Sequence, residues 1–133
     1  MNKAYNIFFE KLMDGKIDLD TNNIYCALFK ATYVPLLTHI HFEEIKSYEA
    51  SGTGYTPYGK LLTGRSLVNK KFDASDVVWI GVTLTDIKYA VIYKKDGPLN
   101  SWLICYMDFD DNRSITNGTF PIEFNSSGIL YFV

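Results

Sequence analysis

Cysteine is scarce in this chain of 133 residues, because Cys26 and Cys105 are the only two. Two cysteines do not make the disulfide framework that is typical of small secreted domains. Both lie inside apolar runs, from Ile24 to Phe29 and from Leu103 to Met107, where a reduced thiol packs as a small hydrophobic side chain. We therefore expect two reduced, buried cysteines, with a single disulfide between them as the alternative.

Long apolar runs and concentrated positive charge are also absent from the sequence. No segment approaches the roughly 18 apolar residues that a membrane-spanning helix needs. The N-terminal apolar stripe is interrupted by Glu10 and Lys11, and no small-residue cleavage site follows it, so we expect no signal peptide. Lysines and arginines are scattered and the net charge is −2, whereas nucleic-acid binders concentrate positive charge on one face. These features predict neither a membrane nor a nucleic-acid partner.

Aromatic residues are abundant, at 16% of the chain, and ten of them are tyrosines. Strands favour aromatic rings because they fit a pleated, half-buried surface, and tyrosine is also common at protein interfaces. The hydrophobic share of 47% and the charged share of 21% are ordinary for a globular protein. The length fits one hydrophobic core, so we predict a single β-rich domain over residues 1–133.

The N-terminal segment has the spacing of an amphipathic helix. From Lys3 to Met13, apolar side chains recur at helical intervals. Asn2 is positioned to cap the start of this helix, and Gly15 is suited to the left-handed conformation that ends many helices. We expect residues 1–15 to form one short helix packed on or beside a sheet, with docking on a partner as the alternative.

The rest of the chain has the pattern of short strands separated by turns. Ile24 to Ala31 carries apolar residues on both faces, which predicts a central strand covered on each side. Leu61 to Asn69 is a further strand candidate, weakened by Gly64. Tyr89 to Lys94 is expected to form a hairpin with Trp102 to Phe109.

Turn residues continue toward the C-terminus. Asp110 to Asn112 and Asn117-Gly118 predict two more turns, followed by final strands around Phe120 to Phe124 and Ile129 to Val133. Strands at roughly ten-residue spacing favour a sandwich or a barrel. We therefore predict a mostly β fold, either an antiparallel β-sandwich or a partly open barrel, with a short N-terminal α-helix.

One alternating pattern has the residue types of a metal site. His39, His41 and Glu43 would share one face if this segment were a strand, and two histidines with a carboxylate can hold zinc. The segment from Tyr33 to Tyr48 is irregular in pattern, however, and no further histidine is present. We interpret these residues as part of a polar loop whose histidines face water, and we expect no metal.

A second pattern has the opening spacing of a calcium loop, with Asp108, Asp110 and Asn112. The position that requires glycine is Arg113, and the position that requires a bidentate glutamate is Thr119. Asp and Asn side chains bond to their own backbone in turns, so a turn explains the pattern more simply.

No signature of a nucleophile with its base, and no phosphate-binding glycine loop in its required context, is present in the sequence. We therefore expect no catalytic residue, no cofactor and no enzymatic activity. The segment 51–59 contains three glycines and a proline, which predicts an exposed loop. Tyr55 and Tyr58 in this loop, and Trp102 beside a turn, are the candidate protein-interface residues.

Short motifs follow one another along nearly the whole chain, in the order Lys16-Ile17-Asp18-Leu19, Ile24 to Phe29, Ser51-Gly52-Thr53-Gly54-Tyr55, Gly59-Lys60, Phe72 to Trp79, Tyr89 to Tyr93, Tyr106 to Phe109, Asn117 to Phe124 and Gly128-Ile129-Leu130. In this order they resemble a family of small virion structural proteins of tailed bacteriophages. The resemblance implies a mostly β, non-enzymatic component that decorates the capsid, forms the base of a head fibre or sits in the tail. The chain departs from the family pattern at residues 86–88 and 98–101, which lie at expected strand ends.

The leading hypothesis is therefore a structural protein of a tailed-phage virion, most simply a capsid decoration or head-fibre protein that acts through protein–protein contacts. Its expected partners are other virion proteins and further copies of itself, and its expected location is the virion, assembled in the bacterial host cytoplasm. A tail or baseplate protein is the adjacent alternative. A carbohydrate-binding β module is the more distant one, with a stacking platform drawn from Tyr55, Tyr58, Trp79 or Trp102.

Overall fold

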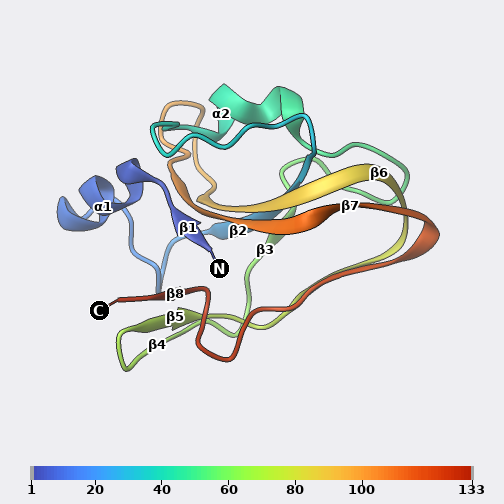
Figure 1. Cartoon of the computed structure of the whole chain (residues 1–133). Coiled ribbons are helices and arrows are strands. Elements are labelled where there is room, and N and C mark those ends of the chain that lie inside the picture. Colours follow the sequence, from blue (N-terminus) through green and yellow to red (C-terminus); the bar gives the residue numbers. More distant parts are fainter. Residues whose placement is uncertain (1, 133) are drawn as a thin grey trace.

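Strands dominate the structure, with short helical segments near the N-terminus and in the first half of the chain (Figure 1). The computed structural model describes residues 2–132. In chain order the elements are β1 (Lys3–Ala4), α1 (Asn6–Met13), β2 (Ile24–Lys30), α2 (Phe42–Ile45), the 3-10 helix η1 (Lys46–Tyr48), β3 (Lys60–Leu61), β4 (Ser66–Val68), β5 (Lys71–Asp73), β6 (Val77–Lys94), β7 (Leu103–Ile122) and β8 (Leu130–Tyr131).

A five-stranded antiparallel sheet with the order β1-β7-β6-β2-β3 forms the centre of the molecule. Its longest part is the hairpin of β6 and β7, which are 18 and 20 residues long. The predicted hairpin is confirmed, because Tyr93 lies opposite Leu103 and Ala90 opposite Met107. Both strands bend together, so their outer halves run back beneath the sheet (Figure 1).

The turns predicted at residues 110–112 and 117–118 are wrong, because β7 continues through both positions. Asp110 and Asn117 have φ angles of 68° and 43°, which Asp and Asn tolerate better than other side chains do. The pairing register between β6 and β7 shifts repeatedly in this part of the hairpin, as it does at β-bulges. These turn-type residues therefore bend the ladder of hydrogen bonds without ending it.

A separate three-stranded sheet with the order β4-β5-β8 lies below the first. Asn69 and Lys70 join β4 to β5 with φ angles of 55° and 64°, as in a two-residue type I′ turn. The prediction of one continuous strand over residues 61–69 is therefore wrong, since this segment contributes to β3 and β4, which belong to different sheets. Gly64, with φ +60°, lies where the chain leaves one sheet for the other. The last predicted strand is β8, and Val133 lies outside the described residues.

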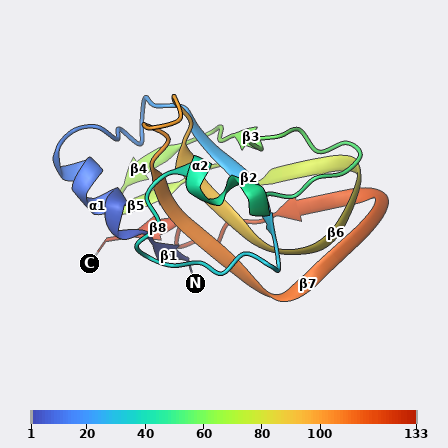
Figure 2. The same cartoon turned by 90° about the horizontal axis from the view of Figure 1, so that it is seen from above.

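Two hydrophobic clusters lie on opposite faces of the central sheet. Cys26 and Leu28 of β2 belong to the cluster between the two layers of strands. Ala27 and Phe29 belong to a second, aromatic-rich cluster on the opposite face. A segment that we call the strap (residues 32–41) covers this second cluster together with α2 (Figure 2). The prediction that β2 is a central strand covered on both faces is confirmed.

The N-terminal helix is shorter than predicted. α1 begins at Asn6, and the two residues Lys3–Ala4 instead pair with Cys105 and Tyr106 as β1. Asn2 does not cap the helix, because its side-chain amide donates a hydrogen bond to the carbonyl of Ile129 at 2.9 Å. A backbone that is recruited into a sheet edge cannot also form the first helical turn.

The predicted fold class is confirmed. Two antiparallel sheets and a short helix account for the regular structure, in a sandwich-like arrangement. Within residues 2–132 neither sheet closes on itself as a barrel. The bent hairpin of β6 and β7 contributes to both layers, and a hollow opens between the two halves of β7.

Candidate functional site

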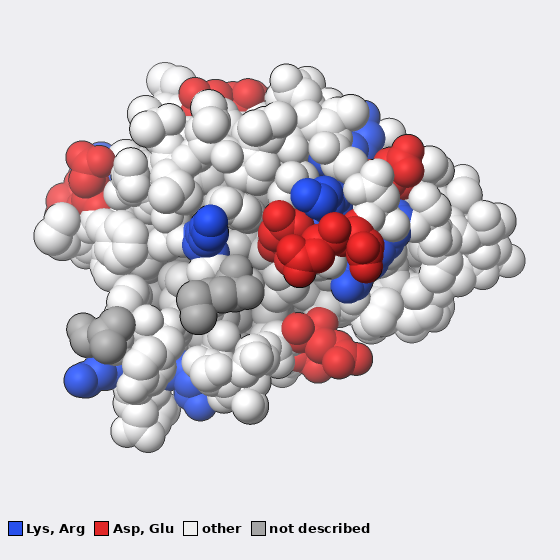
Figure 3. Space-filling view, viewed as in Figure 1, with Lys and Arg blue, Asp and Glu red and all other residues white. Residues whose placement is uncertain are grey.

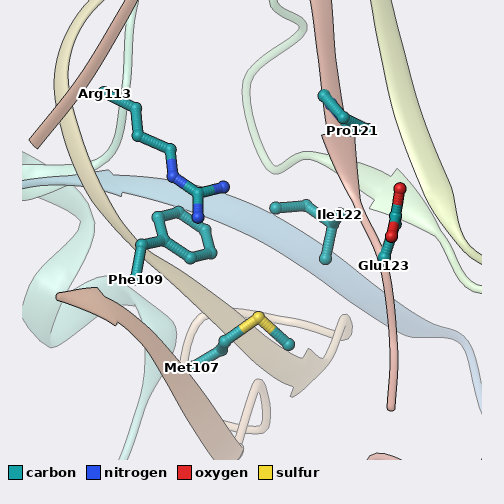
Figure 4. Close-up of a pocket in the computed structure, with 6 residues that line it drawn as sticks. All are labelled: Met107, Phe109, Arg113, Pro121, Ile122 and Glu123. Atoms are coloured by element: carbon teal, nitrogen blue, oxygen red, sulfur yellow. The ribbon is translucent and has the colours of Figure 1, made fainter. Parts of the chain in front are cut away.

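A hollow of about 310 Å³ lies between the two halves of the bent strand β7. Figure 4 shows Met107 and Phe109 from the first half of β7 on one side, and Ile122 from the second half on the other. Arg113, from the bend that connects these halves, reaches across Phe109 with its guanidinium group 4.4 Å from the ring centre. The remaining lining residues are Pro121 and Glu123.

This hollow offers a partner both apolar contacts and ionisable groups. Four of its six lining side chains are apolar, although more of its wall surface is polar than apolar, and an arginine and a glutamate are the only ionisable groups among the six. A guanidinium that stacks on an aromatic face keeps its hydrogen-bond donors free for an incoming acceptor. The hollow therefore suits a partner side chain with an apolar body and a polar tip.

A second candidate site is the strap, which presents four apolar side chains outward while Tyr33 is buried and the backbone is held in place. It contains no Lys, Arg, Asp or Glu. Its large apolar side chains are between 39% and 69% exposed, and they are Val34, Leu36, Leu37 and Ile40. Protein surfaces normally carry exposed apolar side chains singly, whereas here four lie within seven residues and form a patch.

The strap is fixed to the fold by hydrogen bonds along its second half. The amide of Asn6 donates to the carbonyl of Leu37 at 2.9 Å, and the amide of Leu103 donates to the carbonyl of Ile40 at 2.9 Å. Between them, His39 Nδ1 lies 3.0 Å from the hydroxyl of Tyr33. The exposed apolar side chains are thus presented on a segment whose conformation is already set, which lowers the entropic cost of binding.

Tyr33 fastens the start of the strap to the core. Its hydroxyl lies 2.8 Å from that of Tyr5, and its ring packs edge-on against Tyr89. Burial raises the pKa of Tyr33 to about 12, so this phenol stays neutral at physiological pH. The sequence identified this region only as irregular, because exposed apolar residues in a strap have no periodic pattern.

The exposure predicted for Tyr55 is wrong. Its ring is buried and stacks on Trp79 with 5.9 Å between the ring centres. Trp79 itself is buried, as expected for a strand residue that faces the core. A side chain in this position presents no ring to a partner, so neither the interface role nor the sugar-stacking role can belong to Tyr55.

Tyr58 and Trp102 are half-buried, so their proposed interface roles stay predictions. The Tyr58 hydroxyl accepts a hydrogen bond from Lys46 Nζ at 2.7 Å. The ring of Trp102 lies 4.9 Å from Lys11 Nζ and 5.4 Å from Lys94 Nζ. Cations over the indole occupy the ring surface that a sugar would need.

A buried polar network around Glu49 was not predicted from the sequence. The hydroxyl of Tyr55 donates to Glu49 Oε2 at 2.6 Å and accepts from the amide of Leu28 at 3.0 Å. The amide of Tyr58 donates to the same oxygen at 2.8 Å, and the Tyr93 hydroxyl donates to the carbonyl of Tyr58 at 2.7 Å. Burial raises the pKa of Glu49, and these hydrogen bonds offset part of that effect. The network attaches the loop 50–59 to β2, which is a structural role.

The residues of the two candidate metal patterns do not assemble into a site. Within residues 2–132, no group of three or more His, Cys, Asp or Glu side chains is arranged to hold a metal ion. His41 pairs through its backbone with Trp102, away from the hydrogen bond that His39 makes to Tyr33. Asp108 instead forms an ion pair with Lys88 at 3.6 Å.

Both cysteines are free and buried, as predicted. Burial raises the pKa of Cys26 to about 12 and also raises the pKa of Cys105. In the part of the chain that the structure describes, no helix combines the length and the apolar character needed to cross a membrane. No family model, curated protein or solved structure matches this chain.

Proposed function

We propose that this protein is a structural component of a tailed-phage virion, used as a capsid decoration or head-fibre protein and working through protein–protein contacts. The observation that carries the proposal is the strap, where four exposed apolar side chains lie on an immobilised segment of a β-sandwich. The order of the sequence motifs, which resembles that of small virion proteins, supplies the biological context. In this proposal the protein has no catalytic role.

The strap has the properties that a shell-binding surface requires. Exposed apolar side chains gain free energy when a partner covers them, roughly 25 cal/mol for each Å² removed from water. One such patch is small, so a single contact would be weak. A symmetric particle offers many equivalent binding positions, and contacts between neighbouring copies then add to the total.

Location within the virion separates the capsid proposal from its tail alternative. Virions would be divided into heads and tails, and the copy number of this chain in each fraction would be measured by mass spectrometry. Hundreds of copies with the heads support the capsid role, and a few to tens of copies with the tails support the tail or baseplate role. Absence from both fractions would remove the structural proposal.

The strap itself is tested by binding of purified protein to heads that lack it. Replacing Val34 and Leu36 together by serine removes exposed apolar surface without touching the buried core. We expect binding at least about tenfold weaker, which corresponds to about 1.4 kcal/mol. Met13→Ser is the matched control, because Met13 is 80% exposed but lies at the end of α1. Equal losses in both proteins would show that the strap is not the contact surface.

The carbohydrate-binding alternative receives no specific support from the geometry. Tyr55 and Trp79 are buried, and two lysines lie over the ring of Trp102. Titration of the protein with glycans while tryptophan fluorescence is monitored would test it directly. A saturable change would favour the sugar-binding module over the structural role.

A further inference from the structure

Three segments that are far apart in the sequence lie side by side at one end of the molecule. The amide of Thr83 in β6 donates to the carbonyl of Thr53 at 3.0 Å, which holds the loop against the strand. On the other side of β6, Val77 pairs with Ile122 and Leu84 with Ile115 of β7. We call the outer side of residues 51–57, 77–85 and 114–122 the neutral surface.

The neutral surface carries no charged residue in any of its three segments, although 21% of the chain is charged. Charged residues resume directly beyond the strand segments, with Asp76 and Asp86 flanking the β6 part and Arg113 and Glu123 flanking the β7 part. In the space-filling view, the right-hand end of the molecule is correspondingly white (Figure 3). Lys60 lies at one margin, where its ammonium group donates to the carbonyl of Val78 at 2.7 Å.

An exposed isoleucine projects from this surface. Side chains alternate across β6, so Val77 and Trp79 enter the core while Val78 and Ile80 point outward. Ile80 is 75% exposed, and Val78 beside it on the same face is 38% exposed, so together they add apolar surface to the outer side of β6. Because β6 is held on both sides, this side chain is displayed on a fixed backbone.

A shallow hollow of about 180 Å³ lies on the β7 side of the same surface. Ser114, Ile115, Thr119, Phe120 and Pro121 line it together with the exposed Arg113. A projecting apolar side chain and an apolar-lined hollow on one surface are the two halves of a self-complementary contact. In a two-fold symmetric pair, the projection of each copy faces the hollow of the other.

We propose that the neutral surface is the contact between two copies of this chain, with Ile80 of each copy inserted toward the Thr119 side of the other. Charge decides between this occupant and other partners. A strongly charged partner, such as a nucleic acid or an acidic protein, would bury its charges here without counter-charges. A second copy brings three equally uncharged segments, so only the exposed cations at their margins, Lys60 and Arg113, would oppose the contact.

The inference extends the proposed function, since it names one surface through which repeated copies of the protein would contact each other. Its test needs only purified protein and no virion. A virion protein that stays monomeric in solution would refute this inference and leave the proposed function intact. A protein that dimerises in solution but is absent from virions would refute the proposed function and leave this inference intact.

The experiment is sedimentation equilibrium of the purified full chain over a range of concentrations. We expect a concentration-dependent dimer for the wild type. Ile80→Lys and Thr119→Arg place a charge at the centre of the contact and should weaken dimerisation by at least about tenfold. Leu99→Lys is the matched control, because Leu99 is 76% exposed in the turn between β6 and β7, away from the neutral surface.

A second variant covers the case in which a lysine in β6 perturbs folding. Ile80→Thr keeps a β-branched residue that suits a strand but removes apolar surface, and circular dichroism would verify its fold. It should dimerise more weakly than the wild type. A monomeric wild type, or dimerisation that Ile80→Thr and Ile80→Lys leave unchanged, would overturn the inference. Dimerisation lost equally in Leu99→Lys would overturn it as well.

Discussion

Replacing Glu49 by alanine should remove the acceptor that holds the loop 50–59 against β2. The buried hydroxyl of Tyr55 then has no acceptor for its proton, which costs about 1–3 kcal/mol. The amide of the half-buried Tyr58 loses the same acceptor and adds about 1 kcal/mol. We therefore expect Glu49→Ala to lower the free energy of unfolding by about 2–4 kcal/mol. Glu49→Gln keeps an oxygen acceptor of the same shape and should lose clearly less.

The same site gives a pH dependence whose sign follows from the direction of the pKa shift. Burial raises the pKa of Glu49 above its ordinary 4.5, and the hydrogen bonds from Tyr55 and Tyr58 and the charge of Lys46 oppose this only in part. The folded protein therefore binds this proton more tightly than the unfolded chain does. The resulting stabilisation is complete below the unfolded pKa and is lost as pH rises through the folded pKa.

The assay is urea unfolding of the wild type, Glu49→Gln and Glu49→Ala at several pH values from about 4 to 7, a range that brackets the ordinary carboxyl pKa. Fluorescence is a direct probe, because Trp79 stacks on Tyr55. The stability of the wild type relative to Glu49→Gln should fall as pH rises, since other titrating groups cancel in the difference. A difference that is constant, or that grows with pH, would refute the reasoning. So would an alanine variant as stable as the wild type.

Two further predictions concern backbone and thiol burial. Gly59→Ala should destabilise the fold by more than about 3 kcal/mol, because Gly59 has φ +85° and a Cβ there would lie 2.0 Å from the carbonyl oxygen of Cys26. Gly97→Ala, which meets nothing within 4 Å, is the control, and equal thermal unfolding of the two variants would contradict the prediction. Cys26 and Cys105 should react with a thiol reagent only after unfolding, because both are buried and the pKa of Cys26 is raised to about 12. Rapid labelling of the native protein at pH 8 would count against this burial.

The local sequence pattern was sufficient to predict those strands whose burial on each face follows from their own residues. Apolar residues on both faces of β2 predicted a strand covered on each side, and the strand patterns at residues 89–94 and 102–109 predicted the hairpin of β6 and β7. The pattern failed where two structures share one local signal. Asp110 and Asn117 are residues of turns and of bulges alike, and only pairing with β6 decides that the strand continues.

The candidate surfaces lay largely beyond the reach of sequence reasoning. Tyr55 stands in a loop rich in glycine, which predicts exposure, yet the acceptor supplied by Glu49 and the ring of Trp79 draw it into the core. The strap and the neutral surface consist of exposed apolar or uncharged residues, which in the sequence are indistinguishable from core residues. Burial depends on which segments come together, and a local window does not contain that information.

By itself, the sequence of this protein determined a mostly β fold with a short N-terminal helix and two buried thiols, because side-chain periodicity and composition act over a few residues. Only the tertiary structure decided that β6 and β7 bend through both layers and that uncharged residues from three distant segments form one surface. It also decided that a carboxylate is buried against Tyr55. These features depend on contacts between residues far apart in the chain, whose free energies no local pattern specifies.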